Sequence, residues 1–489
     1  MFDATHSPVL CAITRHATVT PDKVALIEGQ NRITYVQLVT NIEAAARFLH
    51  SINVTTGDYI VLAARKEVEF VYLYLAAHLL GVVNVVIDPA SPQDRLDYIL
   101  SIVKPVALFG IDDNVGPTHC IAYNDIDLSD RVGKNIDLPQ IDATSVADVM
   151  FTTGTTGVPK GVCLSHANIA GSANNINAFI GTRDDDVEAL GLPLSHSFGL
   201  GRLRCILMAG GTIVLVGNFA NLKTFFTVME QEHVTGFGMV PAVWQYIKRL
   251  SGTRIGKFAH QLRYIEVGSA ALPIQDKRLL MELFPTTRLC VHYGLTEASR
   301  AIFTELHSDA SRLESIGRPV SSLVDVSILD EHGNQLPDGQ EGELCVKGNM
   351  VTRSYYLQQD NQEAFFGEWF RTGDWGHRDS DGYFYLTGRK KELINVGGEK
   401  VSPATIEDAI RSLGIDDCAC VAIPDPKGVL GEVPKAFLVK NAGDRPAIEE
   451  LQRQLAQRLP AHEIPVQWEW IDQIPRSASG KIQRLKLKH

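Results

Sequence analysis

The sequence predicts a multidomain α/β protein: a large N-terminal domain of layered α/β subdomains with a β-rich subdomain, followed by a small α+β C-terminal domain. Apolar segments with helical spacing alternate with short β-rich runs from residue 35 to residue 283. Such alternation is typical of helices layered on largely parallel sheets. From residue 323 to 384 the pattern changes to short β-rich runs separated by Gly, Asp and Asn, which predicts the β-rich subdomain. A length of 489 residues also favours several domains over one.

The individual elements of the first part follow from the spacing of apolar residues. We expect helices over residues 35–52, 68–80, 92–103, 165–180, 222–232 and 273–283. We expect strands over residues 59–63, 81–88, 106–109, 146–150, 211–216 and 263–268. The most apolar stretch, 71–87, contains His78, Gly81 and Asn84. It is therefore expected to be a buried helix and strand, because a membrane span needs about 20 uninterrupted apolar residues.

The remaining elements divide into two groups on either side of a charged stretch. We expect strands of the β-rich subdomain over residues 324–329, 342–347 and 382–386. We expect C-terminal helices over residues 403–413 and 447–459, and C-terminal strands over 418–423, 435–439 and 466–470. The charged stretch 388–392 separates the two groups, and we place the domain boundary there.

The composition excludes several classes of function. The net charge is −11, with 46 basic against 57 acidic residues, which argues against a nucleic-acid or anionic-membrane surface. The eight cysteines form no Cys-x-x-Cys pair, and no histidine cluster has zinc spacing. We expect reduced thiols in a cytoplasmic protein. The segment 1–6 has no basic region followed by an apolar run, so we expect no signal peptide.

A Gly- and Thr-rich loop at 151–161 follows the expected strand 146–150 and carries the main chemical signal. Its phosphate-binding candidates are Thr152, Thr153, Gly154, Thr155, Thr156, Gly157 and Lys160. The glycines let backbone N–H groups converge, and the hydroxyls and the lysine add donors and positive charge, as a polyphosphate requires. The spacing is not that of a Walker loop. The alternative is a flexible surface loop, for which four threonines and a lysine are a poor choice.

This loop resembles the phosphate loop of the adenylate-forming superfamily, which comprises acyl-CoA and aryl-CoA ligases, adenylation domains of peptide synthetases, and luciferases. The resemblance covers nearly the whole chain, and the other motifs of the superfamily follow in order. It implies that Mg²⁺ and ATP activate a carboxylic acid as an acyl-adenylate with release of pyrophosphate, after which a thiol accepts the acyl group. It also implies a large AMP-binding domain over 1–388, a hinge over 389–391 and a small mobile lid domain over 392–489.

The resemblance assigns nucleotide-binding residues to four further motifs. The adenine is expected at Gly268, Ser269 and Ala270 and at His292, Tyr293 and Gly294. Thr296 can donate its hydroxyl to the α-phosphate, and Glu297 offers a hard oxygen ligand for Mg²⁺. Asp374 can accept both ribose hydroxyls, and the second element of that motif supplies Tyr385 and Arg389.

The acid pocket is expected next to the segment 192–200, where His196 is a candidate catalytic residue. By resemblance, the lining residues are His196, Phe198, Gly199, Met239, Val240, Gly268 and Gly294. No Phe-Asp signature for an α-amino group is present, which favours an ordinary carboxylic acid. Arg202 or Arg204 could meet a second polar or anionic group of the acid, and the alternative is that both are surface arginines on a helix.

Three features of the C-terminal part complete the resemblance. Lys391 matches the hinge position, about which the small domain is thought to swing between two poses. Gly397 and Gly398 would let a pantetheine arm pass close to the backbone, whereas Asn395 stands where many ligases of the family have lysine. Lys481 matches the adenylation lysine, which offsets negative charge on the α-phosphate during the transition state.

Coenzyme A is the favoured thiol, and the phosphopantetheine of an acyl or peptidyl carrier protein is the main alternative. An alternative of another class is a non-catalytic nucleotide-binding relative. Partners are otherwise limited to the small-molecule acid, and the protein is expected to be a monomer or a homodimer.

Overall fold

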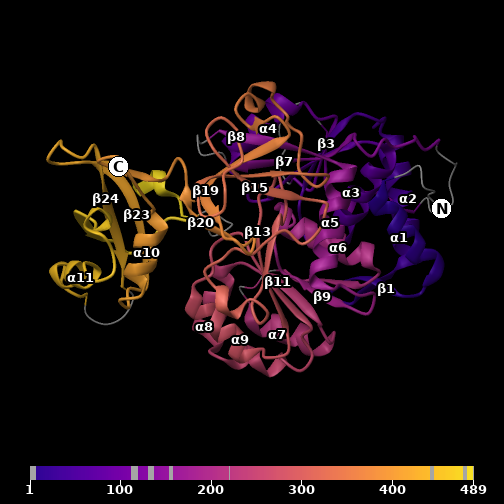
Figure 1. The fold of residues 1–489 in the computed structure, drawn as a ribbon. Helices are drawn as coiled ribbons and strands as arrows, with labels where there is room; N and C mark the ends of the chain where they lie inside the picture. Colours follow the sequence, from indigo (N-terminus) through magenta and orange to yellow (C-terminus); the bar gives the residue numbers. More distant parts are fainter. Residues whose placement is uncertain are drawn as a thin grey trace.

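The computed structural model describes residues 7–111, 119–129, 137–153, 158–217, 219, 221–440, 445–476 and 482–487. Two large sheets with their helices form the bulk of the molecule, and a small C-terminal part lies to one side of them (Figure 1). The two parts meet next to β20 (Phe384–Arg389), which contacts helix α10 (Pro403–Arg411).

The first sheet has the order β17-β8-β7-β4-β3-β5-β6. Its strands are β3 (Tyr59–Ala63), β4 (Val83–Ile87), β5 (Ala107–Phe109), β6 (His119–Ile121), β7 (Val146–Thr153), β8 (Pro159–Ser165) and β17 (Ser354–Tyr355). The strands from β7 to β6 are parallel, whereas β8 pairs antiparallel with both β7 and β17. The β7–β8 hairpin therefore holds the two ends of the Gly/Thr-rich loop next to each other on neighbouring strands.

The second sheet has the order β14-β13-β12-β11-β9-β10-β1-β2. Its strands are β1 (Val24–Glu28), β2 (Asn31–Thr34), β9 (Val187–Leu190), β10 (Thr212–Leu215), β11 (Gly236–Met239), β12 (Tyr264–Val267), β13 (Arg288–Tyr293) and β14 (Ile302–Glu305). The strands from β13 to β1 are parallel, and the two edge strands are antiparallel. The carboxyl ends of β11, β12 and β13 consequently open on one edge, where ligands bind in open α/β sheets.

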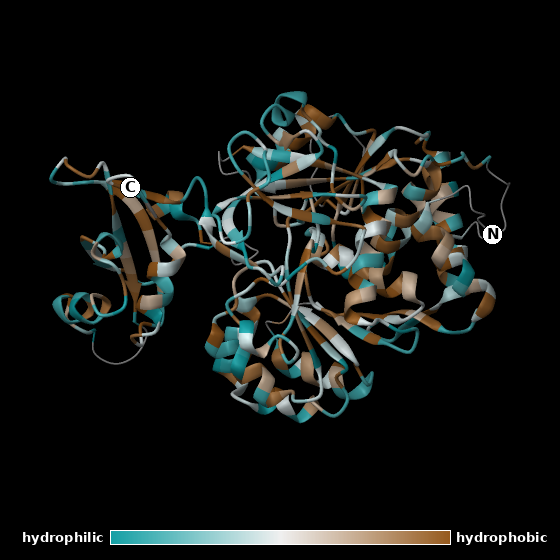
Figure 2. Ribbon diagram, viewed as in Figure 1, coloured by the Kyte–Doolittle hydropathy of each residue, from teal (hydrophilic) through white to brown (hydrophobic). Residues whose placement is uncertain are grey.

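Helices fill the space between the two sheets and cover their outer faces. The first group, which shares one apolar core, is α1 (Pro8–Val19), α2 (Tyr35–Ser51), α3 (Val68–Leu80), α5 (His166–Ile180) and α6 (Ser197–Ala209). The outer helices are α4 (Gln93–Val103) on the first sheet and α7 (Leu222–Gln231), α8 (Pro241–Ser251) and α9 (Ile274–Leu283) on the second. Figure 2 shows brown, apolar ribbon concentrated along these inner layers.

Helix starts are fixed by local capping. Thr34 and Gln37 form a reciprocal capping box at the start of α2, as do Ser165 and Asn168 at the start of α5. Such boxes satisfy backbone N–H groups that the first turn of a helix leaves unpaired. The start of α5 is thereby set directly after β8.

The β-rich subdomain is a third sheet that abuts the first two. Its strands are β15 (Asp325–Leu329), β16 (Gly342–Lys347), β18 (Phe365–Phe366), β19 (Trp369–Arg378) and β20, all paired antiparallel. In the β19–β20 pair, Asp374 lies opposite Arg389. The register thus brings together two residues that are far apart in sequence.

The C-terminal part has a core of its own. Its strands are β21 (Ile394–Val396), β22 (Glu399–Val401), β23 (Asp417–Pro424), β24 (Glu432–Val439) and β25 (Gln467–Trp470). Its helices are α10 and α11 (Ile448–Leu455). Buried residues of both helices and four of these strands form one cluster, among them Ile406, Cys420 and Leu451. A separate core is what an independently moving domain requires.

The predicted fold class is confirmed, and most predicted elements lie within a few residues of the observed ones. The sequence reasoning did not assign helices α1 and α8, and it gave no bounds for α6. The strands that it did not assign are β1, β2, β6, β8, β9, β11, β13, β14, β17, β18, β19, β21 and β22. No helix among the described residues is both long and apolar enough to cross a membrane.

Candidate active site

The predicted phosphate loop lies between β7 and β8. Thr152 and Lys160 are paired across this hairpin, and the Thr152 hydroxyl donates to the Lys160 carbonyl at 3.4 Å. Thr153 is the last residue of β7. Four predicted phosphate ligands, Gly154, Thr155, Thr156 and Gly157, lie outside the described residues.

Lys160 and Glu297 meet around a tyrosine that the sequence reasoning missed. The Tyr355 hydroxyl donates to a Glu297 carboxylate oxygen at 2.6 Å. The Lys160 ammonium lies 5.2 Å from the centroid of the same tyrosine ring and 3.2 Å from a carboxylate oxygen of Asp360. Glu297 is only 8% exposed. Burial of Tyr355, followed by the negative charge of Glu297, raises the pKa of Tyr355. A cation and an oriented carboxylate thus lie side by side.

This cluster has the donor set that a Mg²⁺–polyphosphate needs. No group of three or more His, Cys, Asp or Glu side chains that could hold a metal occurs in the described part of the chain. A single carboxylate such as Glu297 still fits Mg²⁺, which keeps several waters and takes further oxygens from substrate phosphates. Lys160 adds the positive charge that phosphates require.

A second cluster joins Tyr293, Asp374 and Arg389. Asp374 accepts hydrogen bonds from the Tyr293 hydroxyl at 2.5 Å and lies 2.9 Å from Nε of Arg389. Burial, followed by the Asp374 charge, raises the pKa of Tyr293 well above its usual range. The carboxylate is 6% exposed, and these two contacts hold it in a fixed orientation. The predicted residue Tyr385 is not part of this cluster, because its hydroxyl donates to Asp379 further along the hairpin at 3.2 Å.

Two predicted glycines are required by close packing at the ends of β12 and β13. A Cβ on Gly268 would lie 2.0 Å from the His292 ring, and one on Gly294 would lie 2.3 Å from the backbone nitrogen of Arg300. Directly after Gly268, Ser269 adopts a φ of 74° and Ala270 is exposed. Both turns are therefore tight, and only Gly fits at these two positions.

His292 lies between the expected adenine and acid regions. Its Nδ1 is 2.8 Å from a carboxylate oxygen of Glu266, and its ring packs edge-on against Phe198 at 4.7 Å between centroids. Burial lowers the pKa of His292, although the Glu266 charge opposes this effect. His292 thereby connects the carboxyl end of β13 to the start of α6.

The expected acid pocket is assembled from the start of α6 and the ends of β11 and β12. His196 is the N-cap residue of α6, and Val240 is that of α8, whereas Met239 ends β11 and is buried. A Cβ on Gly199 would lie 2.2 Å from the Pro193 carbonyl oxygen, so α6 begins in close contact with the preceding loop. Phe198 is buried beneath the guanidinium of Arg300. The predicted lining residues thus come from neighbouring elements.

Arg300 is a second residue that the sequence reasoning missed. It donates to Glu266 at 2.8 Å and to the backbone carbonyls of Ser197 and Phe198 at 3.2 and 3.0 Å. One buried side chain therefore ties β12 to the first turn of α6. The sequence did carry a signal for such a buried basic partner, namely the acidic Glu266 within an otherwise apolar strand.

The two hypotheses for Arg202 and Arg204 are both wrong. Arg202 is fully buried and pairs with Glu188, with Nε 3.0 Å from each carboxylate oxygen. Arg204 is 2% exposed and pairs with Asp148 at 2.9 Å. Neither lies on the surface, and neither is available to a substrate. Both hold α6 against the strands of the two sheets.

Two of the three C-terminal motifs lie in exposed turns. Lys391 is exposed in a turn directly after β20, and Gly397 and Gly398 adopt φ of 63° and 103° in the β21–β22 turn. The Gly398 N–H donates to the Asn395 side-chain oxygen at 3.1 Å, so Asn395 stabilises this turn. Lys481 lies outside the described residues. Thr296 is half-buried in the turn between Tyr293 and Glu297.

Comparison with known proteins gives matches along most of the chain. The family model described as AMP-binding enzyme matches residues 13–356, and that described as AMP-binding enzyme C-terminal domain matches 405–481. A 2-succinylbenzoate–CoA ligase of Bacillus licheniformis is 30% identical over 97% of this chain and 98% of its own. An oxalate–CoA ligase of Arabidopsis thaliana is 30% identical over 95% of each chain.

Solved structures of other proteins have a similar fold. The o-succinylbenzoate CoA synthetase of Bacillus subtilis in complex with an acyl-adenylate intermediate superposes with a TM-score of 0.87 at 25% identity, and the match covers 98% of each chain. The same synthetase in complex with ATP and magnesium ion gives a TM-score of 0.88 at 25% identity, with 98% of this chain and 99% of that one covered.

Proposed function

Because the chain belongs to the AMP-binding enzyme family, we propose that it is an AMP-forming acid–CoA ligase. The observation that carries the proposal is the convergence of Lys160, Glu297 and Tyr355 at the β7–β8 hairpin. The relatives reported above are named as CoA ligases, which favours coenzyme A over a carrier-protein thiol as acceptor.

In the first half-reaction the substrate carboxylate attacks the α-phosphate of ATP in line, and pyrophosphate leaves. The attacking carboxylate is already an anion, so no side-chain nucleophile or base is needed; positioning and charge neutralisation provide the catalysis. Lys160 and the hydroxyls of the Gly/Thr-rich loop hold the β- and γ-phosphates. Mg²⁺, when bound, offsets the charge of the leaving pyrophosphate, and Glu297 supplies its protein oxygen.

The nucleoside is held by the second cluster. Asp374 accepts the ribose hydroxyls while Arg389 and Tyr293 keep its carboxylate oriented. The adenine lies at the ends of β12 and β13, in the turns that begin at Gly268 and Gly294. Thr296 donates to the α-phosphate. Lys481 stabilises the pentacoordinate transition state, in which negative charge accumulates.

In the second half-reaction the CoA thiol attacks the acyl-adenylate and AMP leaves. We propose a large domain over 1–388, a hinge over 389–391 and a lid domain over 392–489. Rotation about Lys391 removes Lys481 from the site and brings the Gly397–Gly398 turn to it. The acid pocket is formed by His196, Phe198, Gly199, Met239 and Val240 together with the two glycines.

The test is acid-dependent exchange of labelled pyrophosphate into ATP with a panel of aliphatic, aromatic and dicarboxylic acids, followed by detection of CoA thioesters. At least one acid should support both reactions. Glu297→Gln and Asp374→Asn should each lower exchange by about 10²-fold or more. Glu314→Gln, at an exposed position, serves as the matched control and should leave the rate unchanged. If no acid supports exchange, the chain is a non-catalytic nucleotide binder; if exchange occurs without CoA thioester but with acylation of a holo carrier protein, the acceptor is wrong.

A further inference from the structure

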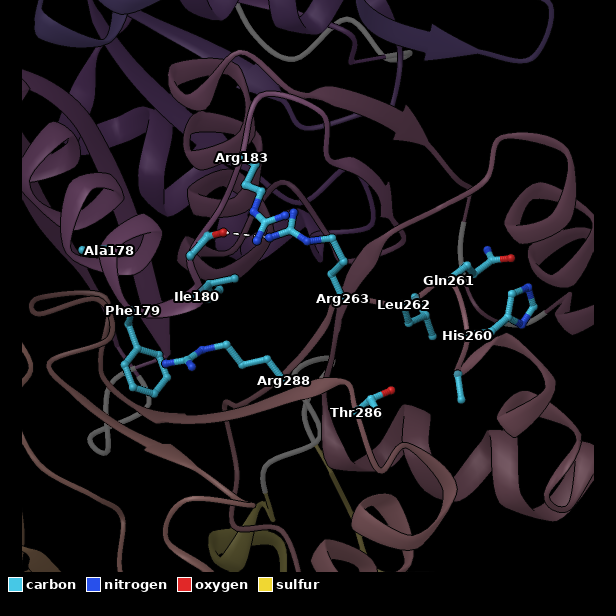
Figure 3. A pocket seen from close by; sticks show the side chains of 12 residues that line it. Ala178, Phe179, Ile180, Arg183, His260, Gln261, Leu262, Arg263, Thr286 and Arg288 are labelled. Atoms are coloured by element: carbon cyan, nitrogen blue, oxygen red, sulfur yellow. Dashed lines mark hydrogen bonds between the residues drawn. The ribbon is translucent and has the colours of Figure 1, made fainter.

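A surface cavity of about 560 Å³ lies on the second sheet, away from the residues described above (Figure 3). It is formed by the C-terminal end of α5, the segment leading into β12 and the segment leading into β13. The lining residues are Ala178, Phe179, Ile180, Gly181, Arg183, Ala259, His260, Gln261, Leu262, Arg263, Thr286 and Arg288. Its volume is in the range of sites that hold small molecules.

The lining is cationic in an acidic protein. Three arginines and a histidine line the cavity, and none of its twelve lining residues is acidic, although the chain has a net charge of −11. Figure 3 shows the guanidinium groups of Arg183 and Arg263 pointing toward each other. Two like charges facing one cavity are unfavourable unless an anion lies between or beside them.

The arginines differ in how far they are already neutralised. Arg263 pairs with the buried carboxylate of Asp186 and donates to the Gly181 carbonyl at 3.0 Å. Within the described part of the chain, neither Arg183 nor Arg288 pairs with a carboxylate. The guanidinium of Arg288 lies 4.8 Å over the Phe179 ring, which restrains its orientation. Two arginines are therefore available to a ligand.

Two guanidinium groups without a carboxylate partner among the described residues, those of Arg183 and Arg288, favour a ligand with more than one negative charge. Asp185 lies 3.8 Å from Arg263 and is 72% exposed, just outside the lining. This carboxylate offsets part of the positive charge of Arg263, so Arg183 and Arg288 supply most of the attraction for an anion. Guanidinium groups bind phosphates in bidentate fashion, and two of them can each hold one phosphate.

We propose that this cavity binds a small phosphorylated metabolite that carries two or more negative charges. The site is separate from the ATP site. Strands β12 and β13 begin beside the cavity, directly after Arg263 and at Arg288, and end directly before Gly268 and at Tyr293. With four and six residues, these strands separate the two sites by about 13–20 Å at roughly 3.3 Å per residue.

The test is isothermal titration calorimetry with fructose 1,6-bisphosphate and with inorganic phosphate, each in the presence of saturating Mg·ATP so that the nucleotide site is filled. The bisphosphate should bind at least about 10-fold more tightly than phosphate, and its affinity should fall as salt is added. Arg183→Ala and Arg288→Ala should each weaken bisphosphate binding about 10-fold. Arg278→Ala, which removes the same charge from an exposed position on α9, should not.

Two results would overturn the proposal. Absence of bisphosphate binding to the wild type would show that the cavity is not a site for this class of anion. Equal binding by the wild type and by the Arg183→Ala/Arg288→Ala double variant would place the anion elsewhere. Circular dichroism and pyrophosphate exchange without added bisphosphate, both expected to be unchanged, show that the double variant is folded.

Discussion

At the residue scale, Glu297 depends on Tyr355, a residue outside every ATP motif. Replacing Tyr355 by Phe removes the hydrogen bond to the carboxylate and leaves the ring under Lys160 in place. A hydrogen bond to a charged group contributes about 1.5–3 kcal/mol, so the apparent affinity for Mg²⁺ should fall roughly 10- to 100-fold. A Mg²⁺ titration of pyrophosphate exchange measures this. Tyr356→Phe is the matched control, since its ring packs against Tyr59 and its hydroxyl donates to a backbone carbonyl. Equal Mg²⁺ dependence in both variants would contradict the role of Tyr355.

The same scale shows what the sequence could predict about the site. Lys160, Glu297, Asp374 and Arg389 each lie in a contiguous motif, and the structure brings them into two clusters. Their partners could not be found in this way, because Tyr355 reaches Glu297 only through the pairing of β17 with β8. The arginines of α6 were misjudged for a related reason: their partners Glu188 and Asp148 lie on strands of two different sheets.

At the element scale, α5 begins with a buried histidine that affects stability. The ring of His166 lies 5.1 Å from that of His78 on α3, which pairs with Asp148 on β7, and Arg204 on α6 pairs with the same carboxylate. Burial, followed by the His78 charge, lowers the pKa of His166 from 6.5 to about 3. Between these values the unfolded chain binds a proton that the folded chain does not, so stability falls as the pH falls below 6.5.

This difference predicts an acid sensitivity specific to His166. Proton uptake by the unfolded chain lowers the free energy of unfolding by about 2 kcal/mol at pH 5 relative to pH 7.5. Glutamine does not titrate. From pH 7.5 to pH 5 the free energy of unfolding of His166→Gln should therefore fall by about 2 kcal/mol less than that of the wild type, whatever the stability of the variant at pH 7.5. Urea unfolding at both pH values measures the change. His50→Gln, at an exposed position, should behave like the wild type; a His166→Gln variant with the wild-type loss would show that this ring takes up a proton while folded.

Elements were predicted where the apolar period was clear. Strand β3 and helix α3 have the predicted bounds, because an uninterrupted β-rich run and a long apolar run fix them. Helix α6 was not assigned, since it contains two glycines, has no side-chain cap and is buried on most of its surface. Helix α8 did carry a signal, a proline at its first position, which was not used.

At the scale of the whole molecule, the mechanism that we propose depends on the junction between the two parts. The Lys390 N–H donates to the Gly373 carbonyl at 2.9 Å, and the Glu392 N–H donates to the Arg389 carbonyl at 2.8 Å. The backbone N–H of Lys391 between them has no partner in the part of the chain that the structure describes, and Lys391 is exposed. Rotation at this residue therefore needs no backbone hydrogen bond of its own to break.

Lys391→Pro should separate the two half-reactions. Proline fixes φ near −65°. This value fits the negative φ of Lys391, but the proline ring prevents rotation about the N–Cα bond of the residue. Acid-dependent pyrophosphate exchange should stay within about threefold of the wild type, because adenylation uses one pose only. Formation of the CoA thioester should fall by about 10²-fold or more, because the second pose cannot be reached. Lys391→Ala, which keeps φ free, is the control and should retain thioester formation. Equal loss of both half-reactions in the proline variant would mean that one pose serves both, and the hinge would then have to be placed outside 389–391.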